Sequence, residues 1–80
     1  MDDSLRNTVQ LYLKVNRRDI AYLANIVSCY EGIALMRTKD PHFAIIEWQV
    51  SPDFLDETLA LIESLKKELS IEIVQWEGNA

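Results

Sequence analysis

The 80-residue sequence predicts an α+β domain whose strands and helices follow the order β-α-β-β-α-β. Three observations lead to this prediction. The apolar residues switch between a period of two and a helical period along the chain. Each switch coincides with a residue type that commonly starts or ends a helix. Between the two predicted helices, a turn sequence divides a long stretch of strand-forming residues.

The first strand and helix are predicted from residues 8–32. The segment Thr8 to Val15 alternates between apolar and polar residues, which is typical of a half-buried strand. Asn16 is expected to be the N-cap of the helix that follows, and Asp19 resembles the acidic half of a capping box. Helical spacing then continues through Val27. We expect Gly32 to end this segment in the left-handed conformation that glycine adopts without penalty.

The second half of the chain predicts a hairpin, a helix and a final strand. Residues 33–50 are rich in strand formers and are divided by Lys39-Asp40-Pro41-His42, which has the composition of a turn. Ser51 is an expected N-cap, and Pro52 suits the first position of a helix. Residues 70–76 predict the last strand. The apolar stripe of the second helix consists of Leu55, Leu59, Ile62, Leu65 and Leu69.

In a chain of this length, this order of elements favours a ferredoxin-like βαββαβ two-layer sandwich. Its four-stranded antiparallel sheet would have the strand order 4-1-3-2, with both helices on one face, because crossover connections are right-handed. We expect a single domain over residues 1–80, with an ordered core over about residues 8–76. The side chains predicted to lie in the core are Leu13, Leu23, Val27, Ile46, Trp48, Leu59, Ile62 and Ile73.

Composition restricts the partners and the compartment that we expect. Eight basic against thirteen acidic residues give a net charge of −5 at pH 7, which disfavours nucleic-acid binding. No apolar run approaches the roughly 20 residues that cross a membrane, so no membrane association is expected. A single cysteine, Cys29, permits no internal disulfide. With no secretion signal in the acidic start of the sequence, we expect a cytoplasmic protein.

The sequence predicts no catalytic, metal or cofactor site. The single histidine, His42, falls in the expected turn, and Cys29 falls late in the first helix as a half-buried structural thiol. A catalytic histidine requires a nucleophile or carboxylate partner, and a zinc site requires several ligands at defined spacing. A glycine-rich phosphate loop is also missing. We therefore expect that the protein is not an enzyme and needs no cofactor.

The sheet face without helices is predicted to carry an apolar patch, which monomers rarely expose. We expect a homo-oligomer, most simply a two-fold dimer packed through this face, with pairing of strand edges as the alternative geometry. A register that turns half of the patch inward is the competing interpretation. The patch would consist of Tyr12, Leu35, Phe43, Ile45, Val74 and Trp76.

Four basic residues form a candidate anion site at one end of the predicted fold: Arg17, Arg18, Arg37 and Lys39. Arg17 and Arg18 lie at a helix start, where the helix dipole disfavours cations. Either Asp19 and Asp40 neutralise them or an anion does. The simpler alternative is a solvated polar surface.

The motifs "RDIAYL", "YEGIA", "RT" and "VSPD" resemble the small prokaryotic family named Domain of Unknown Function 4911, from about Leu11 to the end of the second helix. This resemblance implies a ferredoxin-like fold close to the ACT regulatory domains, and it implies no activity. Many ACT domains bind amino acids at a glycine-containing loop after the first strand, whereas the corresponding loop here, "VNRRD", has no glycine. We therefore expect a self-associating regulatory or protein-interaction module. The alternative is an ACT-like sensor of an amino acid or a small anionic metabolite.

Overall fold

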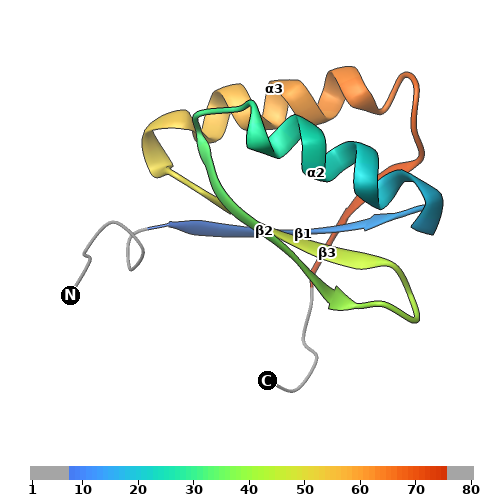
Figure 1. Cartoon of the computed structure of the whole chain (residues 1–80). Coiled ribbons are helices and arrows are strands. Elements are labelled where there is room, and N and C mark those ends of the chain that lie inside the picture. Colours follow the sequence, from blue (N-terminus) through green and yellow to red (C-terminus); the bar gives the residue numbers. More distant parts are fainter. Residues whose placement is uncertain (1–7, 76–80) are drawn as a thin grey trace.

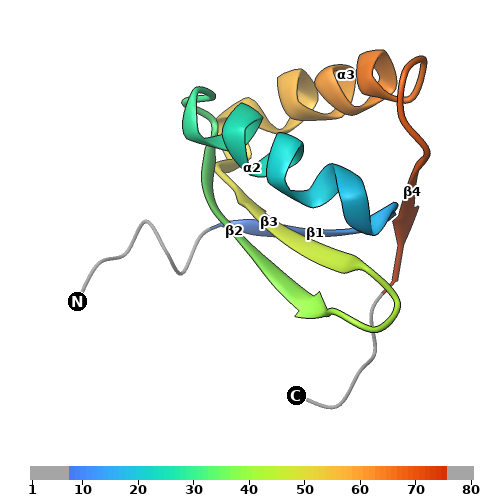
Figure 2. The same ribbon diagram turned by 45° about the vertical axis from the view of Figure 1, so that its right-hand side comes forward.

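The computed structural model describes residues 8–75, which form one sheet and a layer of helices (Figure 1). The strands are β1 (Val9–Val15), β2 (Ile33–Asp40), β3 (Ile45–Val50) and β4 (Ile71–Val74). The helices are α2 (Ile20–Ser28), preceded by the 3-10 turn η1 (Arg17–Asp19), and α3 (Leu55–Leu65), preceded by η2 (Pro52–Phe54). Both α-helices cover the same face of the sheet, as Figure 2 also shows. The predicted α+β class is confirmed.

The sheet has the strand order β2-β3-β1-β4, and all neighbouring strands are antiparallel. Counted from the other edge, this order is 4-1-3-2, so each strand has the neighbours that the sequence predicted. β3 and β1 are the central strands, and β2 and β4 form the edges. The eight-residue strand β2 is twice as long as the four-residue strand β4, so the two edges differ in length.

The core lies between the sheet and the two helices. Leu13 pairs with Ile46, and Trp48 lies next to Leu11 on one side and Met36 on the other. Of the predicted core residues, Leu13, Leu23, Ile46, Trp48 and Ile62 are fully buried, while Val27 and Leu59 are partly buried against them.

The prediction that Ile73 belongs to the core is wrong. Ile73 pairs with Leu13 and therefore shares its face of the sheet, but 42% of its surface is exposed. The physical reason is its position in β4, because an edge strand has a neighbour on one side only. Alternation therefore predicted the direction of the side chain correctly, and it could not predict how completely that side chain is covered.

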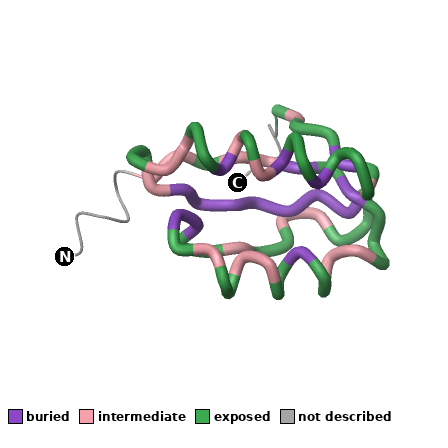
Figure 3. The backbone as a smooth tube through the Cα atoms, turned by 90° about the horizontal axis from the view of Figure 1, so that it is seen from above, coloured by how far each residue is buried: buried purple, intermediate pink, exposed green. Residues whose placement is uncertain are grey.

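Strand β3 is buried on both of its faces, as the tube coloured by burial shows (Figure 3). Ile46, Trp48 and Val50 face the helices, whereas Ile45, Glu47 and Gln49 lie on the face without helices. The latter are buried although no helix covers them. β3 lies between β1 and β2, so long side chains from both neighbours can shield it.

The predicted side-chain caps of the two helices are absent. Neither Asn16 nor Ser51 caps its helix through its side chain. Instead, each helix begins with a 3-10 turn closed by a backbone hydrogen bond of 2.9 Å, from the Asp19 amide to the Asn16 carbonyl and from the Phe54 amide to the Ser51 carbonyl. The sequence thus predicted where the helices start, and the predicted capping chemistry was wrong.

The predicted reason for a glycine at position 32 was also wrong. Gly32 does not have a positive φ, and α2 already ends at Ser28. A Cβ atom at Gly32 would lie 2.5 Å from Cβ and 2.8 Å from Cγ of Phe54. Its carbonyl also accepts a hydrogen bond of 2.9 Å from the Ser51 amide. Gly32 is therefore needed because the chain just before β2 passes close to the 3-10 turn before α3.

The hairpin turn lies two residues later than predicted, over residues 41–44. The side chain of Asp40 accepts hydrogen bonds from the amides of His42 (2.9 Å) and Phe43 (3.2 Å), a local pattern that favours a turn. Ala44 then adopts a φ of 56°. As a consequence, Phe43 lies in the turn and not on the strand.

Thr58 of α3 gives a first testable prediction. Its side chain is fully buried, and its hydroxyl has no hydrogen-bond partner among the described residues. Thr58→Val removes this hydroxyl and keeps the branched shape, so we expect it to stabilise the domain by about 1 kcal/mol in urea denaturation. Thr58→Ser keeps the hydroxyl, loses a buried methyl group and should be less stable than the native chain. A destabilised valine variant would show that the hydroxyl has a partner.

Candidate functional site

The side chains with the most reactive chemistry lie apart on exposed parts of the structure. His42 is exposed in the hairpin turn, where its ring packs edge-on against Phe43 at a centroid distance of 4.7 Å. Cys29 is exposed at the end of α2, so the expectation of a half-buried thiol was wrong. Its sulfur lies 3.9 Å from the hydroxyl of Ser28. These two side chains belong to different elements, and none of the contacts within residues 8–75 joins them to each other.

Residues 8–75 contain neither a cluster of metal ligands nor a helix that could span a membrane. In this part of the chain, no group of three His, Cys, Asp or Glu side chains is placed to hold a metal ion. Neither described helix has the length and apolar character needed to cross a bilayer.

The sheet face without helices, hereafter the open face, carries charged side chains among apolar ones. One row across the sheet contains Val74, Tyr12, Glu47 and Arg37, from β4 to β2. In the next row, Lys14 lies between Glu72 and Ile45. The pairing therefore places a charged residue beside Tyr12 and another beside Ile45.

An ion cluster lies on the β2 side of the open face. The side chain of Glu47 is only 3% exposed, and its Oε1 accepts a hydrogen bond of 3.0 Å from Nε of Arg37. Nζ of Lys39 lies 3.9 Å from the same oxygen. Both cations belong to β2, and the carboxylate belongs to β3. A buried carboxylate thus holds two basic side chains of the edge strand, and the cluster has a net charge of +1.

We expect Arg37→Ala to destabilise the domain by about 1–2 kcal/mol, because Glu47 is then left buried with one distant cation. Arg37 itself is more than half exposed, so water can reach the vacated space and limits the loss. Urea denaturation of Arg37→Ala and Lys39→Ala measures the difference. A loss for Lys39→Ala as large as that for Arg37→Ala would contradict the assignment of Arg37 as the main partner.

The structure disperses the predicted apolar patch. Ile45 is buried, Tyr12 and Val74 are half-buried, and Leu35 is 41% exposed on the open face. Phe43 is 56% exposed, but it lies at the hairpin turn and not on the sheet. Trp76 lies outside the described residues. Because Glu47 and Lys14 interrupt the remaining residues, the open face is less suited to apolar packing than the sequence predicted.

The four predicted anion-binding residues do not form one group. Arg37 and Lys39 belong to the ion cluster around Glu47. Nη2 of Arg17 donates a hydrogen bond of 3.3 Å to the carbonyl oxygen of His42 and so connects η1 to the hairpin turn. Arg18 is exposed, and within residues 8–75 no side chain pairs with it. A carbonyl oxygen, and neither Asp19 nor Asp40, is therefore the partner of Arg17.

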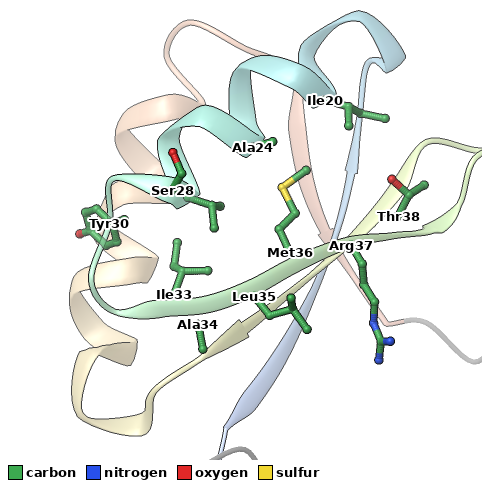
Figure 4. Close-up of a pocket in the computed structure, with 11 residues that line it drawn as sticks. Ile20, Ala24, Ser28, Tyr30, Ile33, Ala34, Leu35, Met36, Arg37 and Thr38 are labelled. Carbon is green, nitrogen blue, oxygen red and sulfur yellow. The ribbon is translucent and has the colours of Figure 1, made fainter.

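A groove between α2 and the edge strand β2 is a concave feature that sequence reasoning missed. It has a volume of about 550 Å³. Ile20 and Ala24 of α2 lie across from Met36 and Thr38 of β2, as Figure 4 shows. The side chains of Leu35 and Arg37 point away from α2, toward the open face. Most residues of the groove wall are thus apolar, and the groove lies directly beside the free edge of β2.

The polar groups at the end of this groove are engaged within the fold. The hydroxyl of Ser28 donates to the carbonyl of Asn25 at 2.8 Å, and the hydroxyl of Tyr30 donates to the carbonyl of Glu57 at 3.3 Å. These bonds leave the groove with few free polar groups. Such a surface is suited to apolar contact more than to chemistry on a substrate.

A second hollow of about 570 Å³ lies beside β1 and β4. Gln10, Leu11 and Tyr12 line one side, and Ile73, Val74 and Gln75 line the other. β4 pairs with β1 only from Tyr12 to Val15, so this hollow begins where the pairing of the two strands stops.

Comparison with known proteins identifies one family. No curated protein and no solved structure matches the chain significantly. The family model described as "Domain of unknown function (DUF4911)" matches residues 13–69, from the middle of β1 past the end of α3. This match covers most of the chain, including the groove and the ion cluster. The chain therefore belongs to the DUF4911 family.

Proposed function

We propose that this protein is a non-catalytic interaction module that associates with itself through the edge of its sheet. The observation that carries the proposal is the outer edge of β2, an eight-residue strand with β3 on one side only. An edge strand presents unpaired backbone N–H and C=O groups, and these pair readily with a strand of another chain. The apolar groove under α2 lies along the same edge.

Two features of the fold support an association of this kind. The domain is small, so its core buries a limited area and a partner that binds only the folded state adds stability. Leu35 is also 41% exposed on β2, which leaves an apolar side chain at the edge in the monomer. The order of elements and the layout of the sheet support a ferredoxin-like arrangement, in which both edges of the sheet are open in an isolated domain.

The positions of the reactive side chains support a non-catalytic role. His42 and Cys29 are both exposed and lie on different elements. The carboxylate of Glu47 is buried in an ion cluster and faces away from the groove.

The concentration dependence of thermal unfolding tests the proposal. If folding is coupled to association, the melting temperature should rise when the protein concentration increases from about 1 to about 100 μM. The expected gain in stability is about 1.4 kcal/mol for each tenfold increase in the concentration of the partner, once this concentration is well above the dissociation constant. A melting temperature that is independent of concentration over this range would overturn the proposal.

A second candidate function is an ACT-like sensor of a small anion, and the ion cluster favours it. Glu47 holds Arg37 through Nε, which leaves the two terminal nitrogens of the guanidinium group at an exposed position beside Lys39. A planar guanidinium group of this kind binds carboxylates and phosphates in a bidentate manner. Arg17 and Arg18 do not belong to this cluster.

A thermal-shift screen with inorganic phosphate, amino acids and nucleotides tests the second function. The expected result is a rise in melting temperature with one class of anion, and Arg37→Ala should abolish that rise. Arg18→Ala is the matched control, since Arg18 is exposed and lies outside the cluster. If no anion shifts the melting temperature of the native chain, this candidate is eliminated.

A further inference from the structure

We infer that the partner is a second copy of this chain and that the two copies pair β2 with β2, antiparallel, around a two-fold axis at Met36. This inference rests on the proposed function, which gives the partner and the edge strand, and it adds the direction and the register of the pairing. The resulting sheet would be continuous through both subunits.

The two faces of β2 restrict the symmetry. Met36 and Thr38 pair with Trp48 and Ile46 and face the helices, whereas Leu35 and Arg37 face the open side (Figure 4). Antiparallel pairing of two edges requires a two-fold axis perpendicular to the sheet, so the helices of both copies lie on the same face. Residues directly opposite each other then share a face. The axis must therefore pass through a residue position and not between two positions.

The regular part of β2 restricts the register further. The pairing with β3 shifts between Ile33 and Leu35 and again between Thr38 and Asp40. Irregularities of this type bend an edge strand and hinder further pairing. Only the stretch from Leu35 to Thr38 is regular, so the axis should lie inside it.

Within this stretch, the positions of the charged side chains and of the irregular residue favour an axis at Met36. An axis at Arg37 would place two guanidinium groups directly opposite each other, and like charges in that position are destabilising. An axis at Thr38 would place Arg37 opposite Lys39 of the second copy, with the same result. An axis at Leu35 would place the irregular Ala34 position directly beside the axis, whereas an axis at Met36 keeps the three central pairs within the regular stretch.

With the axis at Met36, the two methionines meet on the helix side and Leu35 lies opposite Arg37 on the open side. The groove beside each β2 then opens toward that of the other copy, and Met36 of one copy reaches the apolar wall formed by Ala24 and Val27 of the other. The carbon stem of Arg37 can cover the exposed Leu35 of the second copy. Each copy thus provides both the apolar surface and the side chains that cover it, which is the self-complementarity that a two-fold interface requires.

The charge distribution also favours this edge for contact between identical chains. The whole chain has a net charge of −5, so two copies repel each other at most of their surface. β2 is an exception, because its three charged residues are Arg37, Lys39 and Asp40. In the register centred on Met36, neither Arg37 nor Lys39 lies directly opposite a basic residue of the second copy, and each β2 approaches the acidic remainder of the other chain.

Disulfide trapping tests the register. In a chain with Cys29→Ser, we expect Met36→Cys to form a covalent dimer with oxidised glutathione, because opposite residues of antiparallel strands have Cα atoms about 4.5–5.5 Å apart. Leu35→Cys is the matched control, since the two copies of position 35 would be displaced along the strand and face the open side. It should cross-link at least about tenfold less. A mixture of Leu35→Cys and Arg37→Cys chains should form the mixed dimer, because these positions lie opposite each other.

The outcomes separate this inference from the proposed function. Sedimentation as a dimer with efficient trapping at position 36 supports both. Sedimentation as a dimer with no trapping at position 36, or with better trapping at position 35, overturns the register and leaves self-association standing. Loss of the dimer in Tyr12→Lys, which changes the open face beside Glu47, would show that the copies pack face to face and would also overturn the inference. A native chain that stays monomeric overturns both.

Discussion

Trp48→Ala should destabilise the domain by about 3–5 kcal/mol, the largest loss that we expect from a single substitution. Trp48 is the largest of the fully buried side chains and lies on the central strand β3, between Leu11 and Met36. Its removal leaves a cavity that the neighbouring strands can close only in part. For a domain of this size, such a loss is a large fraction of the total stability.

Circular dichroism in a urea titration measures the effect, because it does not depend on the fluorescence of the residue that is replaced. Trp48→Phe is the control. The indole Nε1–H is buried without a hydrogen-bond partner among the described residues. Replacement by phenylalanine reduces the buried volume, which costs stability, but it also removes this unsatisfied donor, which offsets part of the cost. It should therefore be clearly more stable than the alanine variant. A Trp48→Ala midpoint equal to that of the native chain would show that Trp48 is not the centre of the core.

Gly32→Val should destabilise the domain by about 1–3 kcal/mol, because the new side chain would overlap Phe54. A Cβ atom at this position would lie 2.5 Å from Cβ of Phe54, which belongs to the 3-10 turn before α3. Gly32→Ala already introduces this contact and should show part of the loss in the same urea titration.

A double substitution distinguishes steric overlap from backbone strain. Phe54→Gly removes Cβ and the ring of Phe54, so Gly32→Ala should cost less in that background than in the native chain. If left-handed backbone geometry were the reason for the glycine, Phe54→Gly would bring no relief. Equal costs in the two backgrounds would therefore contradict the contact with Phe54 as the cause.

The sequence predicted the arrangement of the elements well because periodicity directly reflects which face of an element is covered. The alternation from Thr8 to Val15 correctly placed Leu13 toward the helices, and the pattern of β3 correctly placed Ile46 and Trp48 beside it. Pro52 correctly marked the start of the second helix. These signals depend on neighbours that are close in the sequence.

The features that the sequence could not predict depend on contacts between distant segments. Gly32 is explained by Phe54, and the burial of Glu47 is explained by its central strand and by Arg37. The position of the turn depends on the hydrogen bonds that the Asp40 side chain accepts from the amides of His42 and Phe43. These bonds place Phe43 in the turn and not in a strand. The groove requires the spacing between α2 and β2, which no local pattern contains.

The central claim, self-association through the β2 edge, is tested most directly by sedimentation equilibrium at tens of micromolar. Three chains are compared: the native chain, Met36→Lys and Ala60→Lys. Met36→Lys places an ammonium group from each copy at the proposed axis, whereas Ala60→Lys adds the same charge at an exposed position of α3. We predict that the native chain and Ala60→Lys sediment as dimers and that Met36→Lys sediments as a monomer. A native chain that sediments as a monomer, or a Met36→Lys variant that sediments as a dimer like the native chain, would contradict the account.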